Sequence, residues 1–127
     1  MKEFIIIFLV LLIIILGDIG IQYYLNSSSA KLVNSLKEIK NLLDSKENSN
    51  IVNEKCNKLY YDWKKTEKRW SIIVLHSELD LIEQALIETK GYILENDIGQ
   101  GKVGIEKSIF LIEHIPDKEA LSLKNIF

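Results

Sequence analysis

The side chains best suited to chemistry lie in one segment, residues 76–86, which reads HSELDLIEQAL. His76 and Asp80 are four residues apart, so a helix places both on one face, with Glu83 one turn further along. His114 could approach this face from a neighbouring antiparallel helix. Imidazole and carboxylate groups on adjacent bundle helices can hold a divalent metal ion. The three residues of the segment are therefore weak metal-ligand candidates.

The same segment lacks the paired Glu-x-x-His units of a di-iron bundle, and we interpret it as the acidic first half of a helix. His76 and Asp80 would then bond to each other or to a neighbouring loop. Alternatively, His76 could carry phosphate, as in histidine phosphotransfer bundles, although the local sequence lacks the usual nearby lysine and small residue. No nucleophile–base pair or oxyanion-hole pattern is evident in the sequence. We expect no enzyme, no catalytic residue, no cofactor and no bound metal.

Length, charge and cysteine content narrow the remaining function classes. The chain has 127 residues, enough for one domain. Its formal net charge is −2 and Arg69 is its only arginine, so it has no electrostatic footprint for nucleic acid or for anionic lipid headgroups. Cys56 is the only cysteine, which excludes an intrachain disulfide and a thiolate zinc site.

An unbroken apolar run, FIIIFLVLLIIIL, occupies residues 4–16. At about 1.5 Å per residue this run covers about 20 Å, and a continuation through the tyrosine pair at 23–24 reaches the ~30 Å of a hydrocarbon core. Paired tyrosines are typical of an interfacial aromatic belt. A cleaved signal peptide would use the small residues at 28–30, which lie too far beyond the apolar run. We predict an uncleaved transmembrane anchor over residues 1–25.

Two polar residues, Asp18 and Gln22, lie within this predicted span. They are four residues apart and share one helix face. One interpretation is that this face meets a partner helix, helped by the small residues Gly17 and Gly20. The other is that Asp18 reaches water at the outer interface. Asp18 and Gln22 are therefore partner-contact candidates.

The N-terminal tail before the apolar run has only three residues. A short tail of this kind is typical of a signal anchor whose C-terminal part lies outside the cell. We predict a single-pass protein of the cell membrane with its C-terminal domain extracytoplasmic.

Beyond the anchor, apolar residues recur at helical spacings of three and four. We predict that residues 26–50 form a stalk or a first bundle helix, followed by a polar loop. The helix is either a new one capped by the serines at 27–29 or a continuation of the membrane helix. A second stripe comprises Val52, Cys56, Leu59, Trp63, Thr66 and Trp70. Cys56 is then a small buried hydrophobe, and both tryptophans are core anchors.

The rest of the chain continues the helical pattern. A third apolar face comprises Ile72, Leu75, Leu79, Ile82, Leu86 and Ile93, and the pattern leaves open whether the second and third helices are separate. A turn at 99–101 precedes a fourth helix over 103–115, which has Ile105, Ile109 and Ile112 in register on one face and which Pro116 ends. The apolar Ile126 and Phe127 close the tail and either pack on the bundle or dock into a partner. The predicted fold is all-α, an N-terminal transmembrane helix followed by an antiparallel bundle of three to four helices, with residues 51–127 as its main part.

Several features together resemble an uncharacterised family, a domain of unknown function, of small single-pass membrane proteins of clostridia and related Gram-positive bacteria. These features are the N-terminal span, the tryptophans at 63 and 70, the HSELDLIE stretch, Tyr92-Ile93, and the closing SLKNIF. The resemblance covers nearly the whole chain. It implies no assigned activity or catalytic residue. It does imply an accessory role beside a larger multi-pass membrane protein and a link to spores.

The function we predict is that of a membrane-anchored structural or interaction protein without catalytic activity. Its partners would be the lipid bilayer and another integral membrane protein, with a homo-oligomer left open and nucleic acid excluded. One alternative is an extracytoplasmic module that senses a ligand or metal near His76, Asp80 and Glu83. The other is a cytoplasmic histidine phosphotransfer-like bundle.

Overall fold

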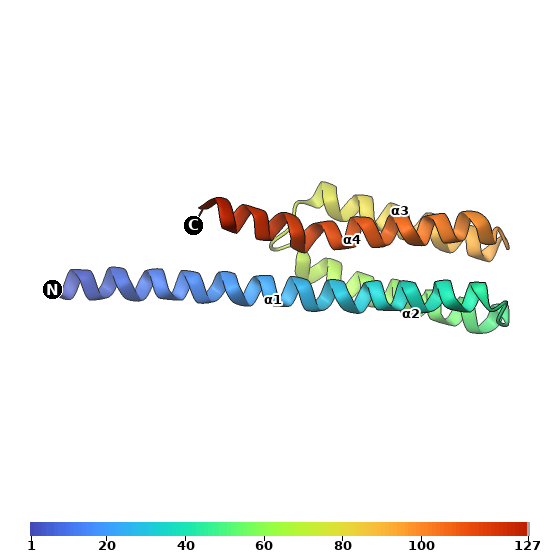
Figure 1. Cartoon of the computed structure of the whole chain (residues 1–127), viewed down its shortest axis with the longest axis horizontal. Helices are drawn as coiled ribbons and strands as arrows, with labels where there is room; N and C mark the ends of the chain where they lie inside the picture. The colour runs from blue at the N-terminus through green and yellow to red at the C-terminus, as the bar shows by residue number, and fades with distance from the viewer. Residues whose placement is uncertain (127) are drawn as a thin grey trace.

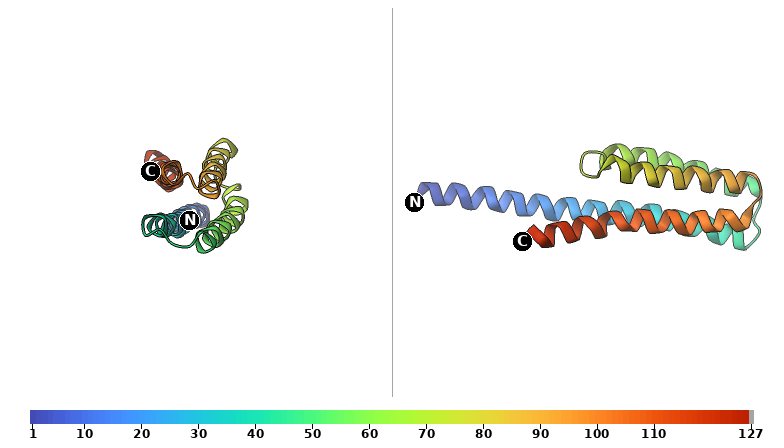
Figure 2. Two further views of the ribbon diagram at one scale, coloured as in Figure 1. Left: turned by 90° about the vertical axis from the view of Figure 1, so that its right-hand side faces the viewer. Right: turned by 90° about the horizontal axis from the view of Figure 1, so that it is seen from above.

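The computed structural model describes the backbone of residues 1–126 and the side chains of residues 1–121. In that part of the chain it contains no strand and four helices, α1 (Lys2–Asp44), α2 (Ser49–Trp70), α3 (His76–Leu94) and α4 (Ile98–Ile126). Consecutive helices pack against each other, and α1 also packs against α4, so the four surround one core, as the end-on view in Figure 2 shows. The predicted all-α bundle with a long N-terminal apolar helix is confirmed.

The first helix, α1, runs without a break from the apolar run into the bundle (Figure 1). Ser28 does not cap a new helix, because its Oγ donates to the carbonyl oxygen of Tyr24 one turn back, at 2.7 Å. Every side chain of residues 1–16 is exposed, whereas Leu25, Leu36 and four other apolar side chains of the second half are buried. The second half of α1 is therefore a full member of the bundle.

The core of the bundle is centred on the two tryptophans of α2. Trp63 and Trp70 are both completely buried, and their rings meet edge to face with centroids 6.1 Å apart. The Trp70 Nε1 donates to Ser28 Oγ of α1 at 2.9 Å, so the indole has a partner for its polar group. These positions confirm the predicted apolar stripe of the second helix, with Cys56 also buried and Thr66 at its edge.

The second and third helices are separate, and the predicted apolar face of the third is wrong at its first two positions. Residues 71–75 form a connection between α2 and α3, in which Ile73 and Val74 donate their backbone N–H groups to the carbonyl of Trp70. Ile72 and Leu75 point outward, 86% and 63% exposed. The prediction assumed that Ile72 and Leu75 lie on the same helix as Leu79. Because α3 begins only at His76, these two residues precede the helix and do not share its buried face.

The fourth helix begins earlier than predicted. The expected turn at 99–101 lies inside the first turns of α4, and the reversal is made instead by residues 95–97, where Asn96 has a φ of 61°. Asparagine tolerates this left-handed conformation better than most residues. The side chain of Asp97 then accepts a hydrogen bond from the backbone N–H of Gln100, at 3.3 Å, which satisfies a free donor in the first turn.

Pro116 does not end α4, contrary to the sequence prediction, and the helix continues to Ile126. A proline inside a helix leaves the carbonyl four residues earlier without its N–H partner. Here that carbonyl belongs to Ile112, and Ser29 Oγ of α1 donates to it at 3.4 Å. The carbonyl of Pro116 itself accepts from Gln22 Nε2 of α1 at 2.9 Å. Two polar side chains of α1 thus stabilise the helix across the proline.

Candidate functional site

The three metal-ligand candidates of α3 do not converge. His76, the first residue of the helix, and Asp80 are both exposed. Glu83 instead faces α2, where its Oε1 accepts from Lys64 Nζ at 2.6 Å and from the Tyr60 hydroxyl at 3.2 Å. The bond from Lys64 holds the pKa of Glu83 below its ordinary value, and the same bond raises the pKa of Lys64. Glu83 is therefore a structural ion-pair partner between α2 and α3.

The fourth candidate, His114, lies on the exposed side of α4. Its ring stacks on that of Phe110 one turn earlier, with centroids 6.2 Å apart. Within residues 1–121, no three His, Cys, Asp or Glu side chains come together as they would around a metal ion.

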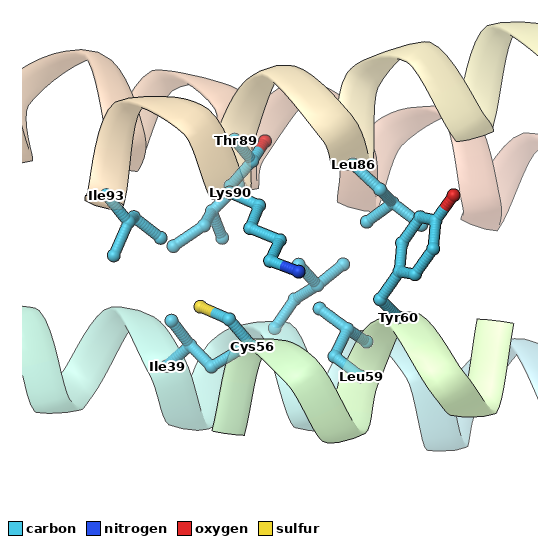
Figure 3. A pocket seen from close by; sticks show the side chains of 10 residues that line it. Ile39, Cys56, Leu59, Tyr60, Leu86, Thr89, Lys90 and Ile93 are labelled. Atoms are coloured by element: carbon cyan, nitrogen blue, oxygen red, sulfur yellow. The ribbon is translucent and has the colours of Figure 1, made fainter. Parts of the chain in front are cut away.

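The only thiol lies in a small cavity lined by residues of α1, α2 and α3 and by Ile105 of α4 (Figure 3). Figure 3 shows Cys56 facing Ile39 and Ile93, with the Lys90 side chain extended towards it from α3. The cavity has a volume of about 10 Å³, which is the room that one water molecule needs. Burial raises the pKa of the Cys56 thiol to about 11, so the sulfur is protonated at neutral pH. This environment suits a packing residue and leaves no room for a ligand.

A larger groove lies where the last part of α4 runs beside α1, beyond the ends of α2 and α3 (Figure 1). It has a volume of about 630 Å³. One residue of α4 and six residues of α1 line it: Ala120 from α4, and Ile15, Asp18, Ile19, Gln22, Tyr23 and Asn26 from α1. The groove is therefore apolar apart from three polar side chains, two of which are the predicted partner-contact residues.

Some polar groups of this groove form hydrogen bonds, whereas at least one has no partner among the described side chains. Gln22 Nε2 donates to the Pro116 carbonyl, and its distance to Asn26 Oδ1 is 3.5 Å. Gln22 Oε1 is buried and accepts no hydrogen bond among the described side chains. The half-buried Asp18, one turn earlier on the same face, adds a carboxylate. The groove thus contains two acceptors, the Asp18 carboxylate and Gln22 Oε1, and the Asn26 amide and Tyr23 hydroxyl that also line it do not donate to Gln22 Oε1.

The remaining partner-contact candidates were Ile126 and Phe127. Phe127 and the side chain of Ile126 lie outside the part of the chain that the structure describes. The sequence had not indicated that Gln22 bonds to the backbone of α4. The two residues of that bond are 94 positions apart in the sequence. The one feature of the sequence that pointed to it was a polar residue, Gln22, within an otherwise apolar helix.

The groove borders the exposed half of α1, which is a candidate membrane span. An 18-residue window of this helix has a mean hydropathy of 3.1, and none of the window is buried in the bundle. By length and composition it is sufficient to cross a bilayer. Gly17 and Gly20 have open space around them, so no described side chain covers this stretch at those points.

Comparison with known proteins places the chain in a family. No curated protein and no solved structure matches it. A family model described as a domain of unknown function (DUF4363) matches residues 19–126, which include the bundle and the lining of the groove from Ile19 onward. This match agrees with the resemblance to an uncharacterised family that the sequence motifs indicated. The chain belongs to this family, the domain of unknown function DUF4363.

Proposed function

We propose that this protein is a single-pass membrane anchor that presents a helical bundle and binds another integral membrane protein through the groove between α1 and α4. The observation on which the proposal rests is the pair of acceptors, Asp18 and the unpartnered Gln22 Oε1, beside an exposed apolar helix. Acceptors that lack donors are costly near hydrocarbon, and a donor from a partner segment would satisfy them.

The exposed half of α1 supports the membrane part of the proposal. Residues 4–16 are apolar and project beyond the bundle with every side chain exposed. In water such a surface would be unfavourable, whereas a bilayer would cover it on all sides. Tyr23, 75% exposed near the end of the proposed span, suits the interface with the headgroups.

The contacts of α1 also argue against removal of the N-terminus as a signal peptide. Cleavage after Ala30 would remove Ser28, which accepts from Trp70, and Ser29, which donates to the Ile112 carbonyl. It would remove the bond from Gln22 to Pro116 as well. These three contacts support an α1 that stays attached to the bundle.

The chemistry of the groove defines the partner. Ile15, Ile19 and Ala120 offer apolar contact, and the two acceptors require a donor such as a lysine, serine or threonine side chain. A transmembrane helix with one such residue near the membrane boundary fits this description. The metal-sensor alternative has less support, because Glu83 is already paired with Lys64.

The partner can be tested by site-specific photocrosslinking in native membranes. A photoreactive residue at Ile19, inside the groove, is expected to form one specific adduct with an integral membrane protein. Asp18→Leu should weaken the adduct about 3- to 17-fold, since interhelical hydrogen bonds in membranes contribute about 0.6–1.7 kcal/mol. Asp80→Leu, which removes an exposed carboxylate elsewhere, is the matched control and should leave the adduct unchanged.

Three outcomes would count against this proposal. Equal adducts from the Asp18 and Asp80 variants would remove the role of Asp18. An adduct of this chain with itself would replace the partner with a second copy. Equal crosslinking from a photoreactive residue at Val103, on the opposite end of the bundle, would indicate nonspecific contact.

We further propose that the bundle lies outside the cell. Cys56 is unsuitable as a probe because it is buried, so we choose Glu47 in the exposed turn between α1 and α2, as Glu47→Cys in a Cys56→Ser background. A membrane-impermeant maleimide is expected to label this variant in intact cells as fully as in lysed cells. Labelling only after lysis would place the bundle inside and revive a phosphotransfer role for the exposed His76.

A further inference from the structure

We propose that the connection between α2 and α3 is a second membrane contact, which inserts Ile72 and Leu75 past the headgroups into the upper part of the acyl chains of the bilayer. The inference rests on the proposed membrane anchor and goes beyond it. It assigns a lipid surface as the partner of the end of the bundle, in addition to the span in α1.

The side chains of this connection divide into an inner and an outer pair. Val74 is buried and Ile73 half-buried, and both pack against the core. Ile72 and Leu75 turn away from the bundle, and Ile72 is the most exposed apolar side chain after Met1 among the described residues. Connections are normally polar and rich in turn-forming residues, so two outward aliphatic side chains in five residues require an explanation.

The three connections of the bundle differ in composition according to which end they occupy. The turn at 45–48 reads SKEN and the turn at 95–97 reads END, and both lie at the end far from the exposed half of α1. The connection at 71–75 reads SIIVL and lies at the opposite end, from which α1 continues into its apolar half (Figures 1 and 2). Only the connection that faces the proposed membrane is apolar.

Specific contacts hold the connection at the level of the tyrosine pair. Trp70, the last residue of α2, bonds to Ser28 of α1, which is one turn beyond Tyr24. At the start of α3, Glu78 Oε1 pairs with Lys118 Nζ of α4 at 2.6 Å. The connection is therefore fixed to both helices that continue towards the membrane, close to the predicted interface.

Neighbouring side chains extend this surface and suit a phospholipid. Tyr23 of α1 and Leu121 of α4 add exposed apolar groups on the two helices that continue past the connection. Arg69, the only arginine, is exposed three residues before Ile72 and lines a groove with Lys31, Lys65 and one carboxylate, that of Asp62, so cations outnumber anions there. Cations next to aliphatic side chains match lipid phosphates above acyl chains. The net charge of the whole chain, −2, gave no indication of this local group of cations.

The insertion can be measured with an environment-sensitive fluorophore on single cysteines of the full chain, in a Cys56→Ser background. The protein is reconstituted in phosphatidylcholine vesicles with or without bromine on the acyl chains, because bromine quenches only fluorophores at acyl-chain depth. A label at Ser71→Cys, which replaces no apolar side chain, is expected to emit at shorter wavelength and to lose intensity in brominated vesicles. A label at Val103→Cys should show neither effect.

Two further variants separate the inference from the proposed anchor. A label at Ile13→Cys in α1 should be quenched strongly, and its failure to be quenched would overturn the anchor itself. Ile72→Asn combined with Leu75→Asn should abolish quenching at Ser71 while quenching at Ile13 persists. If Ile13 is quenched but Ser71 behaves like Val103, the lipid contact is wrong. A wavelength shift at Ser71 without bromine quenching would also overturn it, because a protein surface would then cover the connection.

Discussion

Trp63→Ala is expected to lower the free energy of unfolding by about 3–5 kcal/mol, the usual range for removal of a fully buried large aromatic side chain. Trp63 is completely buried and meets Trp70 edge to face, so the truncation leaves a large cavity and removes an aromatic contact. The core has few other large side chains that could collapse into this space, since its remaining members are mostly leucine, isoleucine and valine.

The measurement is thermal or urea unfolding of the full chain in detergent micelles, followed by the loss of helical circular dichroism. Tyr61→Ala on the same helix is the matched control, because the Tyr61 side chain is 60% exposed and its removal should change stability by no more than about 0.5 kcal/mol. If both variants lose stability equally, the tryptophan pair is not the centre of the core.

Glycine-to-alanine substitutions at two positions are expected to have opposite signs. At Gly104 of α4, a new Cβ would lie 3.2 Å from the Cα of Thr89 in α3, and closer still to its side chain. Because the Cα belongs to the backbone, relief requires the two helices to separate. Overpacking of this kind costs about 1–3 kcal/mol, more than the ~1 kcal/mol that alanine contributes to helix stability over glycine.

Gly91 provides the matched comparison. A Cβ at Gly91 of α3 would meet no atom within 4 Å, so Gly91→Ala should raise stability by about 0.5–1 kcal/mol. The same unfolding measurement applies to both variants. Stabilisation by Gly104→Ala would show that α3 and α4 are packed less closely than their geometry indicates.

The close approach at Gly104 coincides with a buried polar network between the same helices. Thr89 Oγ1 donates to the Ala85 carbonyl at 2.6 Å and Ser108 Oγ donates to the Gly104 carbonyl at 2.8 Å, each within its own helix. The two hydroxyl oxygens lie 3.5 Å apart across the helices, within reach of a hydrogen bond. Separation of α3 from α4 would disturb this packing of two buried hydroxyl groups. The α3–α4 pair is thus closely packed along the stretch that precedes the last part of α4.

The position of this last part of α4 matters for the proposed function because the groove needs both α1 and α4. Only the part of α4 beyond Pro116 reaches the level of Asp18, and α1 keeps that part helical through Ser29 and Gln22. Gln22 therefore has two roles. Its Nε2 donates to the Pro116 carbonyl, while its Oε1 has no donor among the described side chains. A partner that satisfied Gln22 would contact the bundle at the point where α1 supports α4.

The helical core could be predicted from the sequence because it depends on local periodicity. Apolar side chains at spacings of three and four indicate which face of a helix is buried, whatever packs against it. That rule correctly placed Cys56, Trp63 and Trp70 on one buried face, and Ile105, Ile109 and Ile112 on another. The length and hydropathy of residues 4–16 identified the candidate span for the same reason.

What the tertiary structure alone decided depends on residues far apart in the chain. Periodicity could not show that the helix stops at Trp70, so Ile72 and Leu75 were assigned to a core that they do not enter. Nor could local rules foresee that α4 would pass Pro116, because the donors that compensate for it lie on α1. The sequence by itself determined four apolar helix faces and one candidate span. Their packing decided where the polar groups of α1 are satisfied, and left Gln22 Oε1 without a donor among the described side chains.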